Sequence, residues 1–112
     1  MQQVLDRVRA GEEDPACETC GGILKSDTIS FGQALVPEVI SRALRAAATA
    51  DCLLCVGTSL QVYPVAGAVP SAKSAGAHVV IVNAQPTAFD DIADVKLSDP
   101  ISEALPVLCG AR

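Results

Sequence analysis

Aromatic side chains are nearly absent from this sequence of 112 residues, which has one Tyr, two Phe and no Trp. Proteins that bind single-stranded nucleic acid stack its bases on aromatic rings, so this composition argues against such a surface. Basic residues are also few, with 8 Lys and Arg against 13 Asp and Glu and a formal net charge of −5. Because a phosphate backbone attracts the opposite balance of charge, we expect no direct contact with nucleic acid.

Long apolar runs are lacking as well. No run approaches the roughly 20 residues that span a membrane, and the first 14 residues are charged, without the apolar centre of a signal peptide. Five cysteines cannot all pair with one another, which disfavours a secreted disulfide scaffold. We therefore expect a cytoplasmic domain, or part of one, with no membrane contact and an aliphatic core.

The sequence holds a single histidine, His78, at the start of an apolar run and away from any candidate nucleophile. No Ser-His-Asp triad can be assembled around it, so a surface or edge position is the better interpretation. The dinucleotide fingerprint G-x-G-x-x-G is also missing. Asp90, Asp91 and Asp94 lie in a polar connection, which favours solvated loop charge over a catalytic cluster.

An apolar run at residues 52–56 is the most informative segment that is present. It is short and stops abruptly at Gly57, Thr58 and Ser59. Such a run is typical of a strand buried on both faces of a parallel α/β sheet. Ligands bind these sheets beyond the carboxyl ends of the strands, where the three residues offer backbone N–H groups and two hydroxyls. The sequence therefore predicts a nucleotide site here.

Helical and extended patterns flank this strand. Apolar residues recur at helical spacing from residue 36 to 47, with Pro37 at the first helical position. The order helix, strand, helix, strand, strand, helix predicts a parallel sheet with right-handed crossovers. The elements expected after residue 59 are an irregular turn, a helix, two strands and a last helix, at residues 62–67, 70–76, 77–82, 93–97 and 100–108.

The first 35 residues have a different character. Residues 1–16 predict a surface helix or a loose lead-in, and residues 28–31 are the only extended candidate of the Gly-, Ser- and Asp-rich stretch that follows. Cys17 and Cys20 form a Cys-x-x-Cys pair, whereas a structural zinc takes four ligands. From this spacing, metal binding, a redox pair and chance all stay open.

Cys52 and Cys55 belong to the apolar run at residues 52–56. Alternation along a strand should point them to opposite faces, where we expect both to serve as small apolar packing.

Taken in order, these motifs resemble the carboxyl-terminal half of a sirtuin, the family of NAD-dependent protein deacylases. The resemblance implies an α/β fold: the carboxyl-terminal half of a Rossmann-like parallel sheet, with part of a small zinc-binding module. It divides the chain into residues 1–35, with the half zinc module and a substrate-binding segment, and residues 36–112, an NAD-binding half-domain. The motifs that carry the resemblance are Cys-x-x-Cys-Gly-Gly at 17–22, Phe-Gly-Gln at 31–33, Gly-Thr-Ser-Leu at 57–60, Val-Tyr-Pro at 62–64 and Asn83.

The resemblance also implies roles for single residues. Cys17 and Cys20 would be half of a Cys₄ structural zinc site. The residues implied to contact NAD are Gly57, Thr58, Ser59, Asn83, Ala84, Gln85 and Ile101. An acyl-lysine peptide would lie between two extended segments and pair through backbone groups. These segments are Phe31, Gly32 and Gln33, and Val62, Tyr63 and Pro64. Gln33 departs from the Glu that the family commonly has there.

The catalytic histidine, the Gly-rich NAD loop and the first cysteine pair belong to the family's amino-terminal half, and their motifs are not in this sequence. We therefore assign no catalytic residue and expect the chain alone to be inactive. Two alternatives are a non-catalytic remnant with nucleotide or partner binding, and a small Cys-x-x-Cys metal or redox module. The missing neighbouring strand would leave an edge at residues 52–56 open to self-association.

Overall fold

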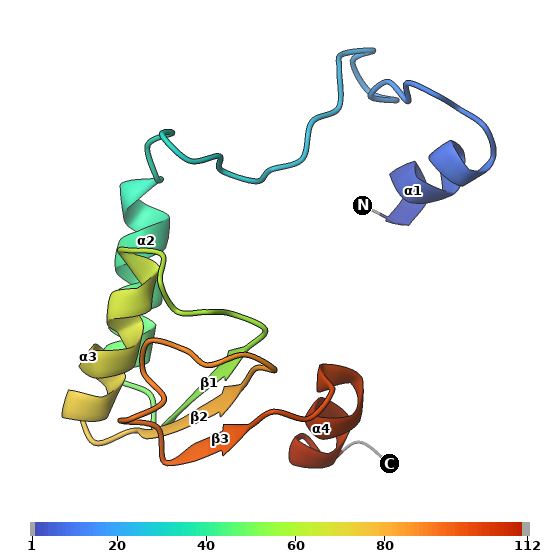
Figure 1. Cartoon of the computed structure of the whole chain (residues 1–112). Helices are drawn as coiled ribbons and strands as arrows, with labels where there is room; N and C mark the ends of the chain where they lie inside the picture. Colours follow the sequence, from blue (N-terminus) through green and yellow to red (C-terminus); the bar gives the residue numbers. More distant parts are fainter. Residues whose placement is uncertain (1, 111–112) are drawn as a thin grey trace. The chain divides into compact units, whose positions relative to one another are not determined.

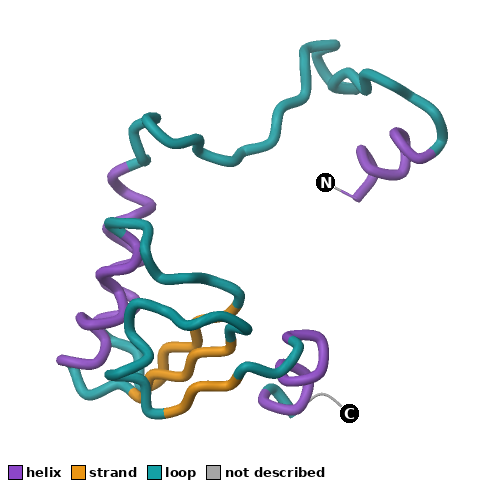
Figure 2. Tube along the Cα trace, viewed as in Figure 1, coloured by secondary structure: helices purple, strands orange, loops and turns teal. Residues whose placement is uncertain are grey.

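A computed structural model describes residues 2–110 (Figures 1 and 2). These residues divide into two compact units, with the boundary along the chain between Ala34 and Leu35. The first unit begins with helix α1, Gln2–Arg9, which confirms the surface helix expected there. The amide of Gln2 donates to the Asp6 carboxylate one turn later, at 2.8 Å, a spacing that supports a short helix. A single antiparallel bridge, Ala16 to Ile23, is the only other regular feature among this unit's described residues.

The extended segment expected at residues 28–31 is not a strand. A strand needs a partner for its backbone groups, and the chain turns here instead. The Gln33 N–H donates to the Ser30 carbonyl at 3.0 Å, and Gly32 sits at a φ of 87°, which closes a tight turn.

The second unit is a three-stranded parallel sheet with helices, as predicted. Strand order in the sheet is β1-β2-β3, with Cys52 in register with His78, Val56 with Val82, and Val80 with Val95. The elements, in chain order, are α2 Pro37–Ala48, β1 Cys52–Val56, the 3₁₀ turn η1 Val65–Gly67, α3 Ala68–Ser74, β2 His78–Val82, β3 Val95–Leu97 and α4 Ile101–Leu108. No helix of the described chain is long and apolar enough to cross a membrane.

Helix α3 begins at Ala68, ahead of the predicted start at Pro70. The prediction was wrong by two residues because proline is tolerated in a first helical turn, where its missing N–H would have no intrahelical partner. The last helix begins at Ile101, one residue after the expected start, and Pro100 is its N-cap residue.

Helices α2 and α3 lie side by side over one face of the sheet (Figure 1). Cys55, Val79 and Ile81 from the strands pack there with Val69 of α3. Small residues at a second contact, Ala47, Ala72 and Ala77, let the two helices and the start of β2 approach closely. The core of this unit therefore lies between the sheet and these two helices.

The expectation that β1 is buried on both faces is wrong. Leu54 is 40% exposed and Cys52 is exposed, whereas Cys55, on the other face, is buried. The reason is that α2 and α3 both cover the face to which Leu53 and Cys55 point. Cys52 therefore does not serve as apolar packing, and only the prediction for Cys55 is confirmed.

Candidate functional site

The carboxyl ends of the strands bring together the segments implied to bind NAD. The Gly57 N–H donates to the Val82 carbonyl at 2.9 Å, and the Asn83 N–H donates to the Leu97 carbonyl at 3.0 Å. Gly57 and Asn83 therefore leave neighbouring strands side by side. A Cβ atom on Gly57 would lie 3.1 Å from Cδ1 of Ile101, so the start of α4 reaches the same place.

The turn after β1 needs a glycine at its first position. Gly57 has a φ of 63°, in the left-handed region that residues with a Cβ rarely adopt. The side chain of Ile101 also leaves little room for a Cβ at this position. Leu60 also has a positive φ of 56°, and its N–H donates to the Thr58 hydroxyl at 3.1 Å. The Ser59 carbonyl accepts from the Ala88 N–H at 3.2 Å. Hydrogen bonds thus fix the turn along its length.

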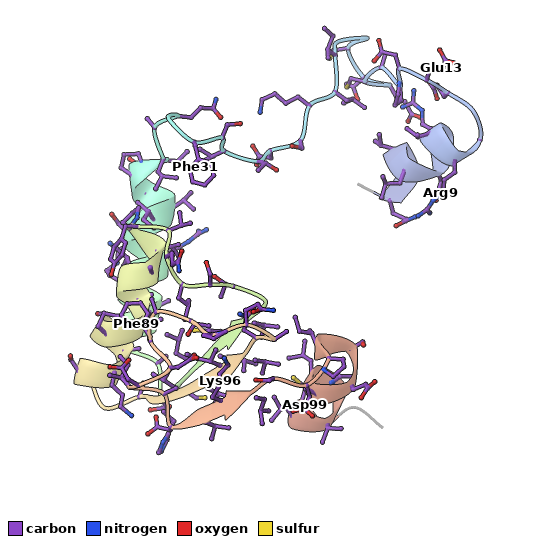
Figure 3. All side chains as sticks on the ribbon, in the orientation of Figure 1. Arg9, Glu13, Phe31, Phe89, Lys96 and Asp99 are labelled. Atoms are coloured by element: carbon purple, nitrogen blue, oxygen red, sulfur yellow. The ribbon has the colours of Figure 1, made fainter. Side chains whose placement is uncertain are left out.

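A lysine of β3 stabilises the turn that follows β2. The side-chain amide of Asn83 donates to the Gln85 carbonyl at 2.9 Å, and the Lys96 ammonium donates to the same carbonyl at 3.0 Å. Lys96 also pairs with Asp90 at 3.2 Å. Figure 3 labels Lys96 on β3 and Phe89, which packs against the sheet core. The Lys96 ammonium, which is itself paired with Asp90, therefore holds residues 83–85 in place.

Sequence reasoning missed this bracing, because it interpreted the nearby aspartates as solvated loop charge. Asp90 accepts from the Thr87 N–H at 3.0 Å, and hydrogen bonds from Thr87 and then Lys96 lower the pKa of its carboxyl. Asp94 accepts from Lys73 at 2.6 Å and from the Val79 N–H at 2.7 Å.

The Lys73 hydrogen bond is the main cause that lowers the pKa of the Asp94 carboxyl. Asp90 is three residues from Thr87, a weak local signal for such a contact. No local sequence pattern predicts the hydrogen bonds of Asp94, because its partners Lys73 and Val79 lie 21 and 15 residues away in the chain. Asp91 is exposed, as expected.

An apolar cavity of about 260 Å³ lies beside Thr58. Burial raises the pKa of the Cys55 thiol that faces it, so this cysteine stays protonated and acts as a small apolar side chain. The cavity is lined by Leu53, Leu54, Cys55, Val56, Thr58, Leu60, Val62, Val65, Ala66, Ala68 and Val69.

The two segments implied to bind peptide are both accessible, but the expectation that they are extended is wrong. Residues 31–33 form a turn, and residues 62–64 lead into the 3₁₀ turn η1, because local backbone hydrogen bonds close both segments. Val62 is 51% exposed and Tyr63 is 67% exposed, and the Val62 carbonyl accepts from the Ala66 N–H at 3.0 Å. In the first unit, Phe31 is 93% exposed (Figure 3), and the Gln33 side chain accepts from the Ser30 N–H at 2.7 Å. The neutral Gln33 thus stabilises its own turn.

Cys17 and Cys20 lie in a closed turn. The Gly21 N–H donates to the Cys17 carbonyl at 2.8 Å, and the Cys17 N–H donates to the Gly22 carbonyl at 2.9 Å. Hydrogen bonds from the backbone N–H groups of Cys20 and then Thr19 lower the pKa of the Cys17 thiol. Two thiol groups in such a turn suit one side of a metal ion, and residues 2–110 contain no group of three or more candidate ligands.

His78 lies far from these features. It is exposed and stands first in β2, in register with Cys52, which confirms the expected surface position. At about 3.3 Å per residue, the length of the strand separates it from the carboxyl ends by roughly 13 Å.

Comparisons with known proteins agree on one family. The model of the family described as "Sir2 family" matches residues 1–64. The chain is 46% identical over 108 residues to NAD-dependent protein deacetylase 2 of Streptomyces coelicolor, a match that covers 96% of this chain and 45% of that protein. It is 44% identical over 97 residues to NAD-dependent protein deacylase 2 of Pyrobaculum aerophilum, covering 87% and 39%. The chain thus spans less than half of the length of these relatives.

Solved structures give the same result. One described as "Structural Basis for the Mechanism and Regulation of Sir2 Enzymes" has a TM-score of 0.72 and 36% identity, covering 96% of this chain and 45% of that one. One described as "Sir2-p53 peptide-NAD+" has a TM-score of 0.71 and 26% identity, covering 99% and 47%. Sequence, fold and motif order lead to one conclusion: the chain belongs to the Sir2 family, the sirtuins.

Proposed function

We propose that this chain supplies the carboxyl-terminal half of an NAD-dependent protein-lysine deacylase, with contacts to NAD and to the acyl-lysine peptide. The observation that carries this proposal is the convergence of Gly57, Asn83 and Ile101 at the carboxyl end of a parallel sheet. Ligands bind doubly wound sheets at that end. The relatives named as NAD-dependent enzymes, and a sirtuin structure described with NAD and peptide, support NAD as the ligand.

The chemistry of the two turns suits the riboses of NAD. Gly57 lets the backbone approach a ligand closely, and the hydroxyls of Thr58 and Ser59 can both donate and accept hydrogen bonds. Asn83 uses its amide N–H to bond Gln85, which leaves the amide oxygen, an acceptor, for a ribose hydroxyl. The segment 83–85 would then hold the adenosine ribose and adenine, with Ile101 as an apolar contact to the base.

Backbone groups would bind the acyl-lysine peptide, and residues 31–33 and residues 62–64 would each, taken separately, offer such groups. Such pairing needs little from the peptide's side chains, so the substitution of Gln33 for Glu should alter preference rather than abolish binding. Sirtuin structures described as bound to acetylated and propionylated peptides support this substrate class. The apolar cavity beside Val62 would supply an uncharged environment next to the peptide.

Cys17 and Cys20 would hold one side of a structural zinc ion. The lowered pKa of the Cys17 thiol favours the thiolate that zinc binds. The remaining two ligands of a tetrahedral site would come from outside residues 2–110. The zinc would stabilise the fold of this module and would take no part in the reaction.

Catalysis would require residues that this chain does not provide. The reaction moves the acyl group from lysine to ADP-ribose and releases nicotinamide, and it needs a general base at the nicotinamide ribose. His78 lies at the opposite end of the sheet from the candidate NAD site, so it is not that base. We expect the 112-residue chain alone to release no nicotinamide from NAD.

A chimeric enzyme tests the proposal directly. Residues 17–108 of this chain would replace the matching segment of the Streptomyces coelicolor deacetylase, to which the chain is 46% identical. We expect the chimera to release nicotinamide from NAD in the presence of an acetyl-lysine peptide. A folded chimera that binds NAD and releases no nicotinamide would support the non-catalytic remnant instead.

Single substitutions in the chimera separate binding from folding. Losing one hydrogen bond to ligand costs about 0.5–1.5 kcal/mol, so Ser59→Ala and Asn83→Ala should each raise the KM for NAD by roughly two- to twelve-fold. Both should leave the melting temperature nearly unchanged. Ser74→Ala, on the exposed end of α3, is the matched control and should change neither quantity. Unfolding with an unchanged KM would make Ser59 and Asn83 structural residues.

A further inference from the structure

One loop, residues 85–90, is hydrogen bonded to both turns of the candidate NAD site. The Ala88 N–H donates to the Ser59 carbonyl, in the turn after β1, at 3.2 Å. The Gln85 carbonyl accepts from the side-chain amide of Asn83, in the turn after β2, at 2.9 Å. A displacement of this loop therefore moves groups in both turns at once.

Lys96 of β3 joins the two ends of the loop. Its ammonium donates to the Gln85 carbonyl at 3.0 Å and to the Asp90 carboxylate at 3.2 Å. Asp90 in turn accepts from the Thr87 N–H at 3.0 Å, inside the loop. The side chains of Lys96 and Asp90 are only 22% and 31% exposed, so solvent screens their charges incompletely. Because charge-assisted hydrogen bonds are about twice as strong as neutral ones, the ammonium holds the loop closed.

The sheet fixes where the Lys96 ammonium lies. Lys96 is in register with Ile81 of β2, which is fully buried in the cluster that contains Val69 of α3. Residues in register point to the same face of a sheet, so the Lys96 side chain lies on the face that the helices cover. Phe89, from the loop, packs against the same cluster (Figure 3). A strand of the sheet therefore presents the ammonium to the loop.

The Gln85 carbonyl connects Lys96 to Asn83. A carbonyl oxygen has two lone pairs, so it accepts from the ammonium and from the Asn83 amide without competition. The position of this oxygen sets the orientation of the Asn83 side chain, because the amide N–H donates to it. The amide oxygen of Asn83, the acceptor proposed for a ribose hydroxyl, is oriented with it.

We propose that Lys96 is a positioning residue for NAD, which acts through the loop on both turns of the candidate site. Its ammonium is committed to Gln85 and Asp90, and its effect on NAD is transmitted through the Asn83 side chain and the Ser59 backbone. This role rests on the proposed function, because it requires NAD at the carboxyl end of the sheet.

Lys73 of α3 provides a matched control. Its ammonium also pairs with an aspartate, Asp94 at 2.6 Å, and both side chains are 35% exposed. Asp94 also accepts from the Val79 N–H, near the opposite end of β2 from Asn83. The two lysines thus form similar ion pairs, and of the two only Lys96 reaches the candidate NAD site.

Replacing Lys96 by methionine in the chimeric enzyme tests this role, because methionine has a similar length and no donors. We expect Lys96→Met to raise the KM for NAD by roughly two- to twelve-fold, the range for one lost hydrogen bond to a ligand. The kcat and the KM for the acetyl-lysine peptide should stay within about two-fold of the parent values. Lys96→Arg, which keeps the charge and can still donate to both acceptors, should restore most of the loss. Lys73→Met should lower the melting temperature and leave the KM for NAD unchanged.

A double-mutant cycle identifies the route by which Lys96 acts. Lys96 and Asn83 meet at one carbonyl, so Asn83→Ala removes the group through which the lysine orients an acceptor for the ribose. Lys96→Met should therefore raise the KM for NAD less in the Asn83→Ala background than in the parent. Effects that simply multiply would show that Lys96 does not act through the Gln85 carbonyl.

Hydrogen exchange in the 112-residue chain, followed by NMR, tests the loop without any ligand. Lys96→Met should speed exchange of the Ala88 N–H, which bonds Ser59, and leave exchange of the Val79 N–H unchanged. Lys73→Met should do the reverse, because Lys73 holds the carboxylate that accepts from Val79. Exchange at Ala88 that does not respond to Lys96→Met would show that the lysine does not hold the loop.

The kinetic outcomes separate this role from the proposed function. An unsubstituted chimera that does not bind NAD would refute the proposed function, and the role of Lys96 with it. A chimera that binds NAD and keeps the same KM with Lys96→Met would refute the role of Lys96 alone. Equal increases in this KM from Lys96→Met and Lys73→Met would show an effect of stability rather than of position, and would also refute it.

Discussion

Replacing Gly57 by alanine tests the geometry on which the candidate NAD site depends. The new methyl group meets two obstacles, a φ of 63° and Cδ1 of Ile101 at 3.1 Å. A side chain in the left-handed region costs about 1–2 kcal/mol at a single residue. The contact adds strain that Ile101 can relieve only by moving its half-exposed side chain. The total should lower the melting temperature of the second unit by roughly 5–15 °C, given about 4–8 °C per kcal/mol for a domain of this size.

A double-mutant cycle with Ile101→Ala separates the two costs. Ile101→Ala removes the contact and leaves the backbone strain, so Gly57→Ala should cost less in that background. Residues in contact typically couple by about 0.5–3 kcal/mol, and we expect a value in the lower half of that range. Gly76→Ala is the control, because Gly76 also has a positive φ, of 94°, and has no atom within 4 Å of its Cβ position. Its cost should be the same with and without Ile101.

Urea unfolding followed by circular dichroism measures all the variants without any ligand. Equal costs of Gly57→Ala in both backgrounds would show that Ile101 does not contact the turn after β1. The start of α4 would then lie away from Gly57, and the convergence that supports the NAD proposal would be lost. A Gly57→Ala variant as stable as the parent would refute both the left-handed turn and the contact.

Three further predictions concern charge and thiols. Asp90 and Asp94 have carboxyl pKa values held below the ordinary 3.8, so their contribution to stability is complete above about pH 4 and is lost as pH falls through their lower folded-state values. Asp94→Asn should lower the urea midpoint at pH 7 and flatten its decline towards pH 3, whereas the exposed Asp91→Asn should do neither. Iodoacetamide at pH 7 should label Cys17 faster than an unstructured cysteine peptide and buried Cys55 last, as read by mass spectrometry; Cys55 labelled with Cys17 would contradict the core assignment. Elemental analysis of dialysed monomer should find much less than one zinc per chain, and tightly held stoichiometric zinc would mean that the ligands are misassigned.

The sequence predicted the sheet well because its signal is local. The runs at residues 52–56 and 77–82 are apolar, short and ended by Gly57 and Asn83, and each became a parallel strand within a residue of the expected bounds. Pro37 likewise marked the start of α2. Helices and strands whose composition and terminal residues are distinctive can be predicted without knowing what they pack against.

The contacts that hold the candidate site were not predictable in the same way. Lys96 bonds the Gln85 carbonyl, and Asp94 bonds the Val79 N–H, across 11 and 15 residues. No periodicity or motif marks such pairs, because they arise only once β2 and β3 lie in register. The family resemblance implied a contact between Ile101 and NAD, but no local pattern predicts that Ile101 lies beside Gly57.

The error about β1 is informative about what surrounds it. Its sequence is that of a strand covered on both faces, yet Leu54 and Val95 remain exposed in one row on the face that α2 and α3 do not cover. Contiguous exposed aliphatic surface is uncommon on soluble monomers, because it invites association. The composition of β1 therefore predicts a covering over Leu54 that residues 2–110 do not supply.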